Sequence, residues 1–325
     1  MKTVLVTGGA GYIGSVVARA FKTHDPSMCV AVIDYQPNDH TKHGIDFYAD
    51  CNYASDQGLH LIDFFQPDII VHCAGTSLVG PSLKQPYTYY HNNVENTLKL
   101  LNLFSHRKKK PIILFSSSAS VYGEPEHIPV DEDHRLSPIS PYGNTKLVIE
   151  YMLQDFYKAY GISSCAFRYF NAAGAIPGPN PLGQLPGATH IIAQALEASI
   201  NRRPFVINGF DYDTIDGTCT RDYVHVWDIA TAHVEMVNYI KSNPGHHKFN
   251  LGSGIGYTNM QIASYIKEKY GLDIKHGPRR DGDPAILIAD SKSIQQTIPI
   301  DFAQSTLSSV IDSAYEWYKN FLYKQ

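Results

Sequence analysis

A glycine-rich turn directly after a short apolar run is the feature that most restricts the fold of this 325-residue chain. The run at 3–7 is followed by Gly8, Gly11 and Gly14, and an amphipathic helix is predicted over 12–22. Gly8 permits a tight turn, Gly11 lets backbone amides approach a pyrophosphate, and Gly14 lets the helix pack closely on the strand. The pattern therefore predicts a dinucleotide site, with a glycine turn that binds nothing as the alternative.

The first half of the chain alternates short β-branched runs with amphipathic stretches. Strands are predicted at 3–7, 30–33, 69–71, 112–115 and 164–167, with another short strand ending at Asp50. Helices are predicted at 12–22, 57–65, 87–105 and 142–160. This alternation is typical of an α/β fold with a Rossmann-type, doubly wound parallel sheet, in which ligands bind beyond the carboxyl ends of the strands.

A stretch rich in glycine and proline, at 171–187, interrupts this pattern. Eight of its seventeen residues are Gly or Pro, so we expect regular structure to stop and a loop or lid to begin. Beyond it, helices are predicted at 190–200, 227–240, 259–270 and 304–322, with a strand near Val206. We predict an NAD-binding Rossmann domain at 1–172, joined by a returning segment near 221–241, and a smaller C-terminal α/β domain at 173–325 that binds the substrate.

Composition excludes several classes of protein. A net charge of −4 argues against a nucleic-acid surface, and no apolar segment approaches the ~18 residues of a membrane span. The five cysteines form no C-x-x-C pair, which is typical of reduced thiols, so we expect a cytoplasmic, membrane-free protein. None of the fifteen histidines falls in an H-E-x-x-H arrangement, and we expect no metal site.

Asp34 indicates which dinucleotide binds. It follows Gly14 by twenty residues, where a carboxylate would accept hydrogen bonds from the ribose hydroxyls of NAD and repel an additional 2′-phosphate. Asp50 is a candidate partner for the adenine amino group, although a solvated loop aspartate is nearly as good an interpretation. The small residues after His72 would lie against the dinucleotide.

Tyr142 and Lys146 indicate hydride-transfer chemistry. Positions i and i+4 share one face of a helix, so the ammonium would lie beside the phenol and favour its phenolate. Moving a tyrosine pKa from ~10 to about 7 requires roughly 4 kcal/mol. Ser118 precedes Tyr142 by 24 residues, at the end of a run of three serines.

Eight blocks of the sequence resemble the extended short-chain dehydrogenase/reductase family, nearly from end to end. They are TGGAGYIG (7–14), HCAG (72–75), YYHNNV (89–94), SSSASVYG (116–123), PYGNTK (141–146), RYFN (168–171), DGTCTRDY (216–223) and PRRDGD (278–283). The last two blocks are similar to those of sugar-nucleotide epimerases. The resemblance implies a 4-epimerase that interconverts UDP-glucose and UDP-galactose.

The resemblance also implies roles for individual residues. Tyr142 is the acid/base, Lys146 binds the nicotinamide ribose and lowers the tyrosine pKa, and Ser118 holds the sugar 4-hydroxyl. The residues implied to contact NAD are Gly8, Gly11, Tyr12, Ile13, Gly14, Asp34, Asp50, Cys51, Cys73, Ala74, Gly75, Asn92, Ser117, Tyr142, Lys146 and Phe170. Those implied to contact the UDP-hexose are Ser118, Tyr142, Asn171, His190, Arg221, Arg280 and Asp283.

In the implied mechanism, sugar carbon 4 is oxidised, the keto sugar rotates about its diphosphate, and the hydride returns to the opposite face. NAD stays tightly bound and is not consumed. Arg221 and Arg280 would neutralise the diphosphate, as planar guanidiniums do well; ion pairs with Asp222 or Asp283 are the alternative. The resemblance also implies a homodimer formed through the helices at 87–105 and 142–160.

Other activities remain open. Three positions depart from the pattern of these epimerases. Ser77 stands where many of them carry lysine, and Leu287 stands where some carry a large tyrosine. Residues 186–192 resemble a segment of one subgroup of the family but lack its glutamate and its final proline. Ser77 bears on NAD binding, residues 186–192 on the choice of nucleobase, and Leu287 on room for an N-acetylated sugar. Epimerases of UDP-N-acetylglucosamine, UDP-glucuronate or UDP-xylose are alternatives that only the shape of the pocket distinguishes. A 4,6-dehydratase is disfavoured because Ala119 and Ser120 stand where it needs an acid and a base. A non-catalytic NAD sensor and a nucleic-acid-binding module are the remaining alternatives.

Overall fold

The large sheet of the protein has seven strands, all parallel. The computed structural model describes residues 2–36, 42–279 and 284–322. The strand order is β10-β6-β5-β4-β1-β2-β3. The strands are β1 (Thr3–Thr7), β2 (Cys29–Asp34), β3 (Phe47–Asp50), β4 (Ile69–His72), β5 (Ile112–Ser118), β6 (Ser164–Tyr169) and β10 (His246–Leu251). The predicted Rossmann-type fold class is confirmed.

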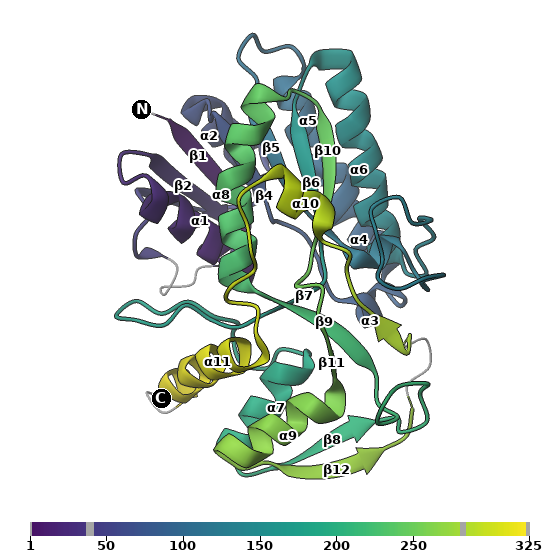
Figure 1. Cartoon of the computed structure of the whole chain (residues 1–325). Coiled ribbons are helices and arrows are strands. Elements are labelled where there is room, and N and C mark those ends of the chain that lie inside the picture. The colour runs from purple at the N-terminus through teal and green to yellow at the C-terminus, as the bar shows by residue number, and fades with distance from the viewer. Residues whose placement is uncertain (1, 37–41, 280–283, 323–325) are drawn as a thin grey trace.

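Helices cover both faces of this sheet (Figure 1). Alternate residues of a buried strand face opposite sides, so Val4 and Val6 pack with one group of helices and Leu5 with the other. The first group is α1 (Tyr12–His24) and α8 (Val226–Ser242), which contact each other. The second group is α2 (Asp56–Phe65), α5 (Asn96–Ser105) and α6 (Pro141–Tyr160).

The helix predicted at 87–105 has the expected extent but is not one α-helix. It consists of α4 (Pro86–Tyr89), the π-helical segment η2 (Tyr90–Glu95) and α5. Within η2, the buried side chain of Asn93 accepts a hydrogen bond from the Thr76 amide at 2.8 Å and donates to Thr145 Oγ1 at 3.0 Å. These contacts need Asn93 to face the interior, which the wider π-turn allows. Two short helices, α3 (Val79–Ser82) and the 3₁₀ turn η3 (Ala119–Val121), were not predicted.

A second, smaller group of elements packs below the large sheet (Figure 1). Its core contains Leu196, Ile262, Ile311 and Trp317. Its strands are β7 (Asn171–Ala173), β9 (Thr220–His225), β11 (Gly256–Thr258) and β13 (Ile286–Leu287) in one sheet, and β8 (Pro204–Asn208) and β12 (Asp273–Gly277) in another. Its helices are α7 (Ile191–Ile200), α9 (Asn259–Tyr270) and α11 (Leu307–Leu322), while the short α10 (Lys292–Thr297) contacts β10.

One expectation about the middle of the chain needs correction. Regular structure does not stop at Asn171, because β7 pairs in parallel with β9, and Ile176 and Leu182 then form an isolated bridge. The segment predicted to return near 221–241 contains α8, which packs on the large sheet beside α1, and the unpredicted strand β10 then follows α8 and pairs with β6. The domain boundary at 172 remains a prediction. Within the described ranges, no helix has the length and apolarity needed to cross a membrane.

Candidate active site

A cleft of about 1440 Å³ opens at the carboxyl ends of β1, β4, β5 and β6. Parallel sheets of this kind bind ligands at that edge. Residues from the smaller group of elements, such as His190 and Arg221, complete the wall of the cleft. The cleft therefore joins the two parts of the chain that were predicted to bind the cofactor and the substrate.

The glycine turn forms one end of the cleft and is built for close approach of backbone. Gly8 has φ +71°, and a Cβ added to it would lie 2.6 Å from the Ala74 amide nitrogen. A Cβ on Gly14 would lie 2.3 Å from the Gly8 carbonyl oxygen. Gly11 is the N-cap of α1 and has no side chain to bond the helix amides. The turn thus presents a helix N-terminus to the cleft, as a pyrophosphate site requires.

Asp34 ends β2 beside this turn and lines the cleft. Its carboxylate accepts hydrogen bonds from the Ala10 amide at 3.0 Å and from the Gln36 amide at 3.0 Å. These two bonds orient the carboxylate while leaving lone pairs for ribose hydroxyls. The geometry fits the role predicted for Asp34.

Asp50 differs from the prediction. It ends β3, as expected, but its side chain is exposed and does not line the cleft. The next residues, Cys51, Asn52 and Tyr53, line the cleft instead. Asn52 and Tyr53 were not predicted, although their position just after a strand end was the available signal.

The other residues predicted to hold the dinucleotide do line the cleft. They come from the start of α1, from η2, and from the carboxyl ends of β4, β5 and β6 or just after them. These residues are Tyr12, Ile13, Cys73, Ala74, Gly75, Asn92, Ser117 and Phe170. Asn92 is oriented by a hydrogen bond from its Nδ2 to Thr76 Oγ1, at 3.0 Å. Ser117 donates to the buried carboxylate of Glu150.

The three predicted catalytic side chains meet in this cleft. Tyr142 and Lys146 lie on the first turns of α6, whose N-cap, Ser140, accepts a hydrogen bond from the Gly143 amide at 3.1 Å. Lys146 Nζ lies 5.7 Å from the centroid of the Tyr142 ring and donates to the Ser116 carbonyl at 2.7 Å. Ser118, at the end of β5, is hydrogen-bonded to Tyr142.

Burial controls the titration of this group. It raises the pKa of Tyr142 above the usual value, and the hydrogen bond with Ser118 only partly opposes this effect. Burial also lowers the pKa of Lys146 to about 8, while the nearby acidic groups of Cys73 and Glu150 act in the opposite direction. Burial thus has the largest effect on the pKa of Tyr142 in this structure, and the lowering of that pKa by Lys146 stays a prediction.

Asn171, His190 and Arg221 lie on the substrate side of the cleft. Asn171 Nδ2 donates to the Asp222 carbonyl at 2.9 Å, and Arg221 Nη1 donates to the Thr220 carbonyl at 2.9 Å. His190, which is exposed, is the N-cap residue of α7. Arg280 and Asp283 lie outside the described residues.

The alternative role for Arg221, an ion pair with Asp222, has little support. The Asp222 carboxylate is buried and accepts hydrogen bonds from the amides of Ser253, Gly254 and Ala289, at 2.7–3.1 Å. These neutral donors, together with the Ser253 hydroxyl, already satisfy the carboxylate. Arg221 instead faces the cleft, where an anion would bind.

Tyr169 is a further residue that the sequence reasoning missed. It lines the cleft, its hydroxyl is 3.0 Å from Ser116 Oγ, and it is 2.9 Å from Nε2 of the buried His233. The signal was available, since Tyr169 is the last residue of β6 and directly precedes Phe170. Ser77 and Leu287, noted as departures from the resembling family, also line the cleft.

Together, the fold and the site define a class: a dinucleotide-binding enzyme of the short-chain dehydrogenase/reductase type, whose cleft brings Tyr142, Lys146 and Ser118 together. NAD fits this site, because a Cβ on Gly8 or Gly14 would clash with backbone, so the turn stays open to a pyrophosphate, and Asp34 lines the cleft beside it. The chain belongs to the NAD dependent epimerase/dehydratase family, whose model matches residues 4–252.

Known relatives agree with this assignment. The chain is 38% identical to a UDP-glucose 4-epimerase of Halalkalibacterium halodurans, over 97% of this chain and 95% of the relative. It is similar to the crystal structure of the Brucella ovis UDP-glucose 4-epimerase in complex with NAD, with a TM-score of 0.90, 35% identity and 98% of each chain covered. The Bifidobacterium longum UDP-glucose 4-epimerase in complex with NAD+ and UDP gives a TM-score of 0.89 at 30% identity, again over 98% of each chain.

Proposed function

We propose that this protein is an NAD-dependent 4-epimerase that interconverts UDP-glucose and UDP-galactose. The observation that carries the proposal is the convergence of Tyr142, Lys146 and Ser118 at a cleft that also contains the glycine turn and Arg221. Relatives named UDP-glucose 4-epimerase, which this chain matches over almost its whole length, support the choice of reaction and substrate.

Each residue of the site has a task in this reaction. NAD, when bound, supplies the acceptor for the hydride of sugar carbon 4. Tyr142 accepts the proton of the 4-hydroxyl, and Ser118, hydrogen-bonded to Tyr142, holds that hydroxyl in place. Lys146 places a positive charge beside the phenol and favours its anion, while Arg221 binds the diphosphate. Binding energy is thus concentrated away from the sugar, because the sugar must rotate between the two hydride transfers.

The residues after Ser118 argue against elimination of water. Ala119 is buried in a small apolar cluster, and the Ser120 hydroxyl accepts a hydrogen bond from Ser118 Oγ at 3.1 Å. A dehydratase needs an acid and a base at these positions, and neither an alanine nor a serine titrates near neutral pH.

A second candidate substrate is an N-acetylated UDP-hexose. Leu287 of β13 lines the cleft, and a leucine leaves more room than the tyrosine that some related enzymes carry there. A UDP-glucose/UDP-N-acetylglucosamine 4-epimerase of Campylobacter jejuni has the same fold, with a TM-score of 0.84 and 34% identity.

An activity assay with four substrates tests the proposal. We expect purified protein to carry NAD and to interconvert UDP-glucose and UDP-galactose, with the N-acetylated pair as the comparison. Turnover of none of these sugars by protein that carries NAD would exclude the proposed function.

We also propose that the protein is a cytoplasmic homodimer. Its five cysteines are free thiols, as a reducing compartment maintains them. Tyr90, Leu98 and Tyr151, on η2, α5 and α6, are apolar residues exposed by 41–51%, and they suit an interface between two copies. Light scattering at micromolar concentration should give twice the monomer mass; a monomer would contradict the dimer.

A further inference from the structure

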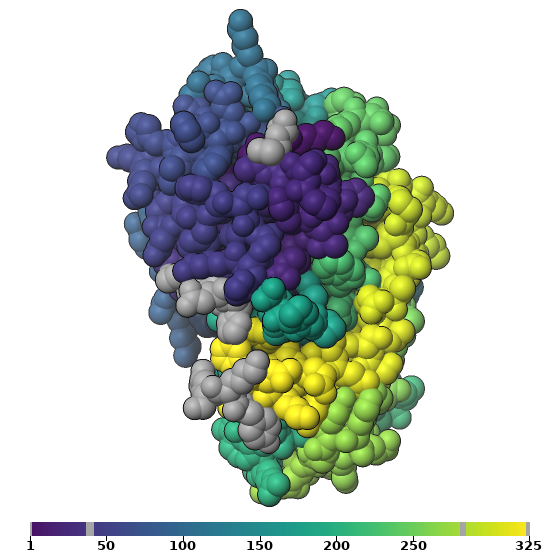
Figure 2. Space-filling model, turned by 90° about the vertical axis from the view of Figure 1, so that its left-hand side faces the viewer, coloured from purple at the N-terminus to yellow at the C-terminus, as the bar shows by residue number. Residues whose placement is uncertain are grey.

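The segment 174–187, between β7 and α7, runs over the surface where the two parts of the protein meet. Figure 2 shows a teal segment between the purple N-terminal region and the yellow C-terminal region. Gln184 and Leu185 of this segment line the same cleft as Gly11 and Tyr12. The segment therefore forms part of the wall around the glycine turn that holds the dinucleotide.

One end of the segment is fixed to the glycine turn itself. The Tyr12 hydroxyl donates to the Gly174 carbonyl at 2.6 Å, and the Ala175 amide donates to Ser313 Oγ of α11 at 3.1 Å. Further along, Ile176 and Leu182 exchange two backbone hydrogen bonds, and the Leu182 side chain is buried in the core beside α1 and α8. This half of the segment is anchored both to the Rossmann part, through Tyr12 and the core around Leu182, and to α11.

The other end is fixed by Trp317 of α11. The indole Nε1 donates to the Gln184 carbonyl at 2.7 Å, and the ring is 97% buried. A Cβ added to Gly183 would lie 2.5 Å from the indole ring, so the backbone passes directly against it. The Trp317 side chain thus contacts the segment in two ways, by a hydrogen bond to Gln184 and by packing of the indole ring against Gly183. Both residues directly precede Leu185, which lines the cleft.

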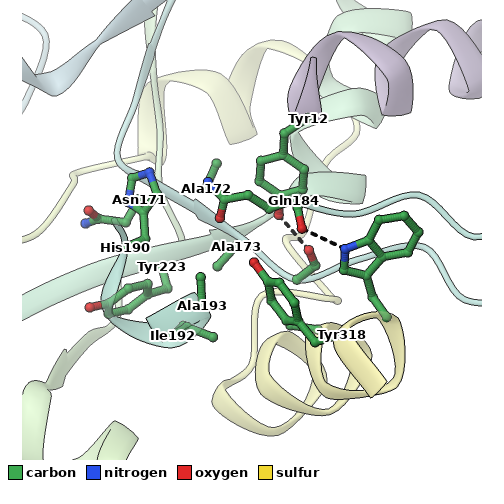
Figure 3. A pocket seen from close by; sticks show the side chains of 13 residues that line it. Tyr12, Asn171, Ala172, Ala173, Gln184, His190, Ile192, Ala193, Tyr223 and Tyr318 are labelled. Atoms are coloured by element: carbon green, nitrogen blue, oxygen red, sulfur yellow. Dashed lines mark hydrogen bonds between the residues drawn. The ribbon is translucent and has the colours of Figure 1, made fainter. Parts of the chain in front are cut away.

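Tyr318, the neighbour of Trp317, provides a contrast. Figure 3 shows Tyr12 and Tyr318 directing their hydroxyls toward the same small cavity, whose volume is about 20 Å³. The Tyr318 hydroxyl is buried and has no hydrogen-bond partner among the described residues. Of these two adjacent aromatic side chains of one helix, only Trp317 is hydrogen-bonded to the segment.

We propose that residues 174–187 act as a strap that retains the dinucleotide, and that Trp317 is the positioning residue that holds this strap against the glycine turn. The inference rests on the proposed function, in which NAD must stay bound through both hydride transfers. Loss of the indole N–H would remove the donor to the Gln184 carbonyl and loosen the strap where it borders the cleft. The expected consequence is faster release of NAD without a change in the chemical step.

The test compares Trp317→Phe with Tyr318→Phe as its matched control. Each protein is loaded with NAD+ and diluted, and the NAD that remains bound per chain is followed over time by gel filtration and absorbance. We expect Trp317→Phe to release NAD about tenfold faster, equivalent to about 1.4 kcal/mol, and Tyr318→Phe to release it at the wild-type rate. With saturating NAD+ added, the turnover number of Trp317→Phe should match that of the wild type.

Tyr12→Phe provides a second test if Trp317→Phe does not fold. It removes the hydroxyl that holds the strap at Gly174, so it should also accelerate release. Wild-type release rates in the folded variants would overturn the proposal, and so would equal acceleration in Tyr318→Phe. These outcomes differ from failure of the proposed function, which would be the absence of sugar turnover in protein that retains NAD.

Discussion

At the scale of single residues, the position of Tyr142 determines what the site can do. Its ring is buried and its pKa is raised, so the phenol is a weak acid until a substrate hydroxyl and a nearby cation change its surroundings. Lys146 is the available cation, held by the Ser116 carbonyl at 2.7 Å. Tyr142 is therefore suited to exchanging a proton with a sugar hydroxyl in either direction, as a reversible epimerisation requires.

We expect Tyr142→Phe to lose turnover by about 10²–10⁴-fold, the usual contribution of a positioned acid/base group. NAD content should stay at the wild-type level, because the substitution removes only the hydroxyl. Turnover with UDP-glucose and absorbance of the bound cofactor measure both quantities. Tyr151→Phe, on an exposed face of the same helix, is the control and should have full activity. Near-complete activity in Tyr142→Phe would show that another group is the base.

The site was predictable where it depends on spacing and unpredictable where it depends on burial. The i, i+4 pair of Tyr142 and Lys146, and the twenty residues from Gly14 to Asp34, follow from the local geometry of a helix and of a β-α-β unit. The pKa of Tyr142 is set instead by the surrounding protein, which no spacing reports. Asp50 was misplaced for the same reason, because the direction of a side chain at the end of the edge strand β3 depends on the packing around it.

At the scale of elements, a buried ion pair connects the strands and the helix around Ser118, Tyr142 and Lys146. Arg168 of β6 donates to Glu150 of α6 at 2.7 Å, and both side chains are at least 96% buried. Glu150 also accepts a hydrogen bond from Ser117 of β5, and Arg168 Nη1 donates to the Tyr122 hydroxyl at 2.9 Å. The pair thus connects β5, α6 and β6 through Ser117, which precedes Ser118, and through Glu150, one helical turn after Lys146.

We expect Arg168→Met to lower the free energy of unfolding by about 3–5 kcal/mol, because it leaves the Glu150 charge buried and unpaired. The double variant Arg168→Met with Glu150→Met should recover much of that loss, since it buries no charge. Arg107→Met, which breaks the exposed pair with Asp63, is the control and should cost no more than ~1 kcal/mol. Urea unfolding measures all three. An effect of Arg168→Met as small as that of the control would contradict a stabilising role for the pair.

The glycine turn gives a second prediction at this scale. In Gly14→Ala the new Cβ would lie 2.3 Å from the Gly8 carbonyl, so the turn must open and its amides must move. We expect NAD affinity to fall by about tenfold or more, equivalent to at least ~1.4 kcal/mol, in a calorimetric titration. A Cβ on Gly80 would meet nothing within 4 Å, which makes Gly80→Ala the control. Equal NAD affinity in the two variants would show that NAD binding does not depend on the close approach of backbone at Gly14.

The elements themselves were predicted well in the first half of the chain and less well afterwards. The β-α alternation is a local pattern, so the strands and helices up to β6 follow from periodicity. The return of β10 to the large sheet depends on pairing with β6 across 82 residues, from Ser164 to His246, which no local pattern specifies. Likewise, β7 forms within a glycine- and proline-rich stretch because β9 supplies its hydrogen-bond partners.

At the scale of the whole molecule, two buried neutral histidines connect the sheet to the helices on both of its faces. His72, at the end of β4, lies 2.7 Å from Thr7 Oγ1 and 2.8 Å from Thr97 Oγ1. His233 of α8 donates from Nδ1 to the Ile229 carbonyl at 2.8 Å, so its Nε2 accepts from the Tyr169 hydroxyl. Burial lowers the pKa of His72 to about 3 and that of His233 to about 4.

These lowered pKa values make the folded protein sensitive to acid. Above an unfolded-state pKa of about 6.5 both histidines are neutral in either state, and their full contribution to stability is present. Between pH 6.5 and 4 the unfolded chain binds protons that the folded chain excludes, so each histidine lowers the free energy of unfolding by up to ~1.4 kcal/mol per pH unit. Stability should therefore fall steeply from neutral pH toward pH 4.

His233→Gln tests this linkage directly. A glutamine oxygen can still accept from Tyr169 but does not titrate, so the variant should have a shallower pH dependence, by up to ~1.4 kcal/mol per pH unit, whatever its stability at pH 7. Urea unfolding of both proteins at pH 7, 6 and 5 gives the two slopes. Identical slopes would mean that His233 binds protons equally in the folded and unfolded states, which is incompatible with a neutral, buried imidazole between Tyr169 and the Ile229 carbonyl.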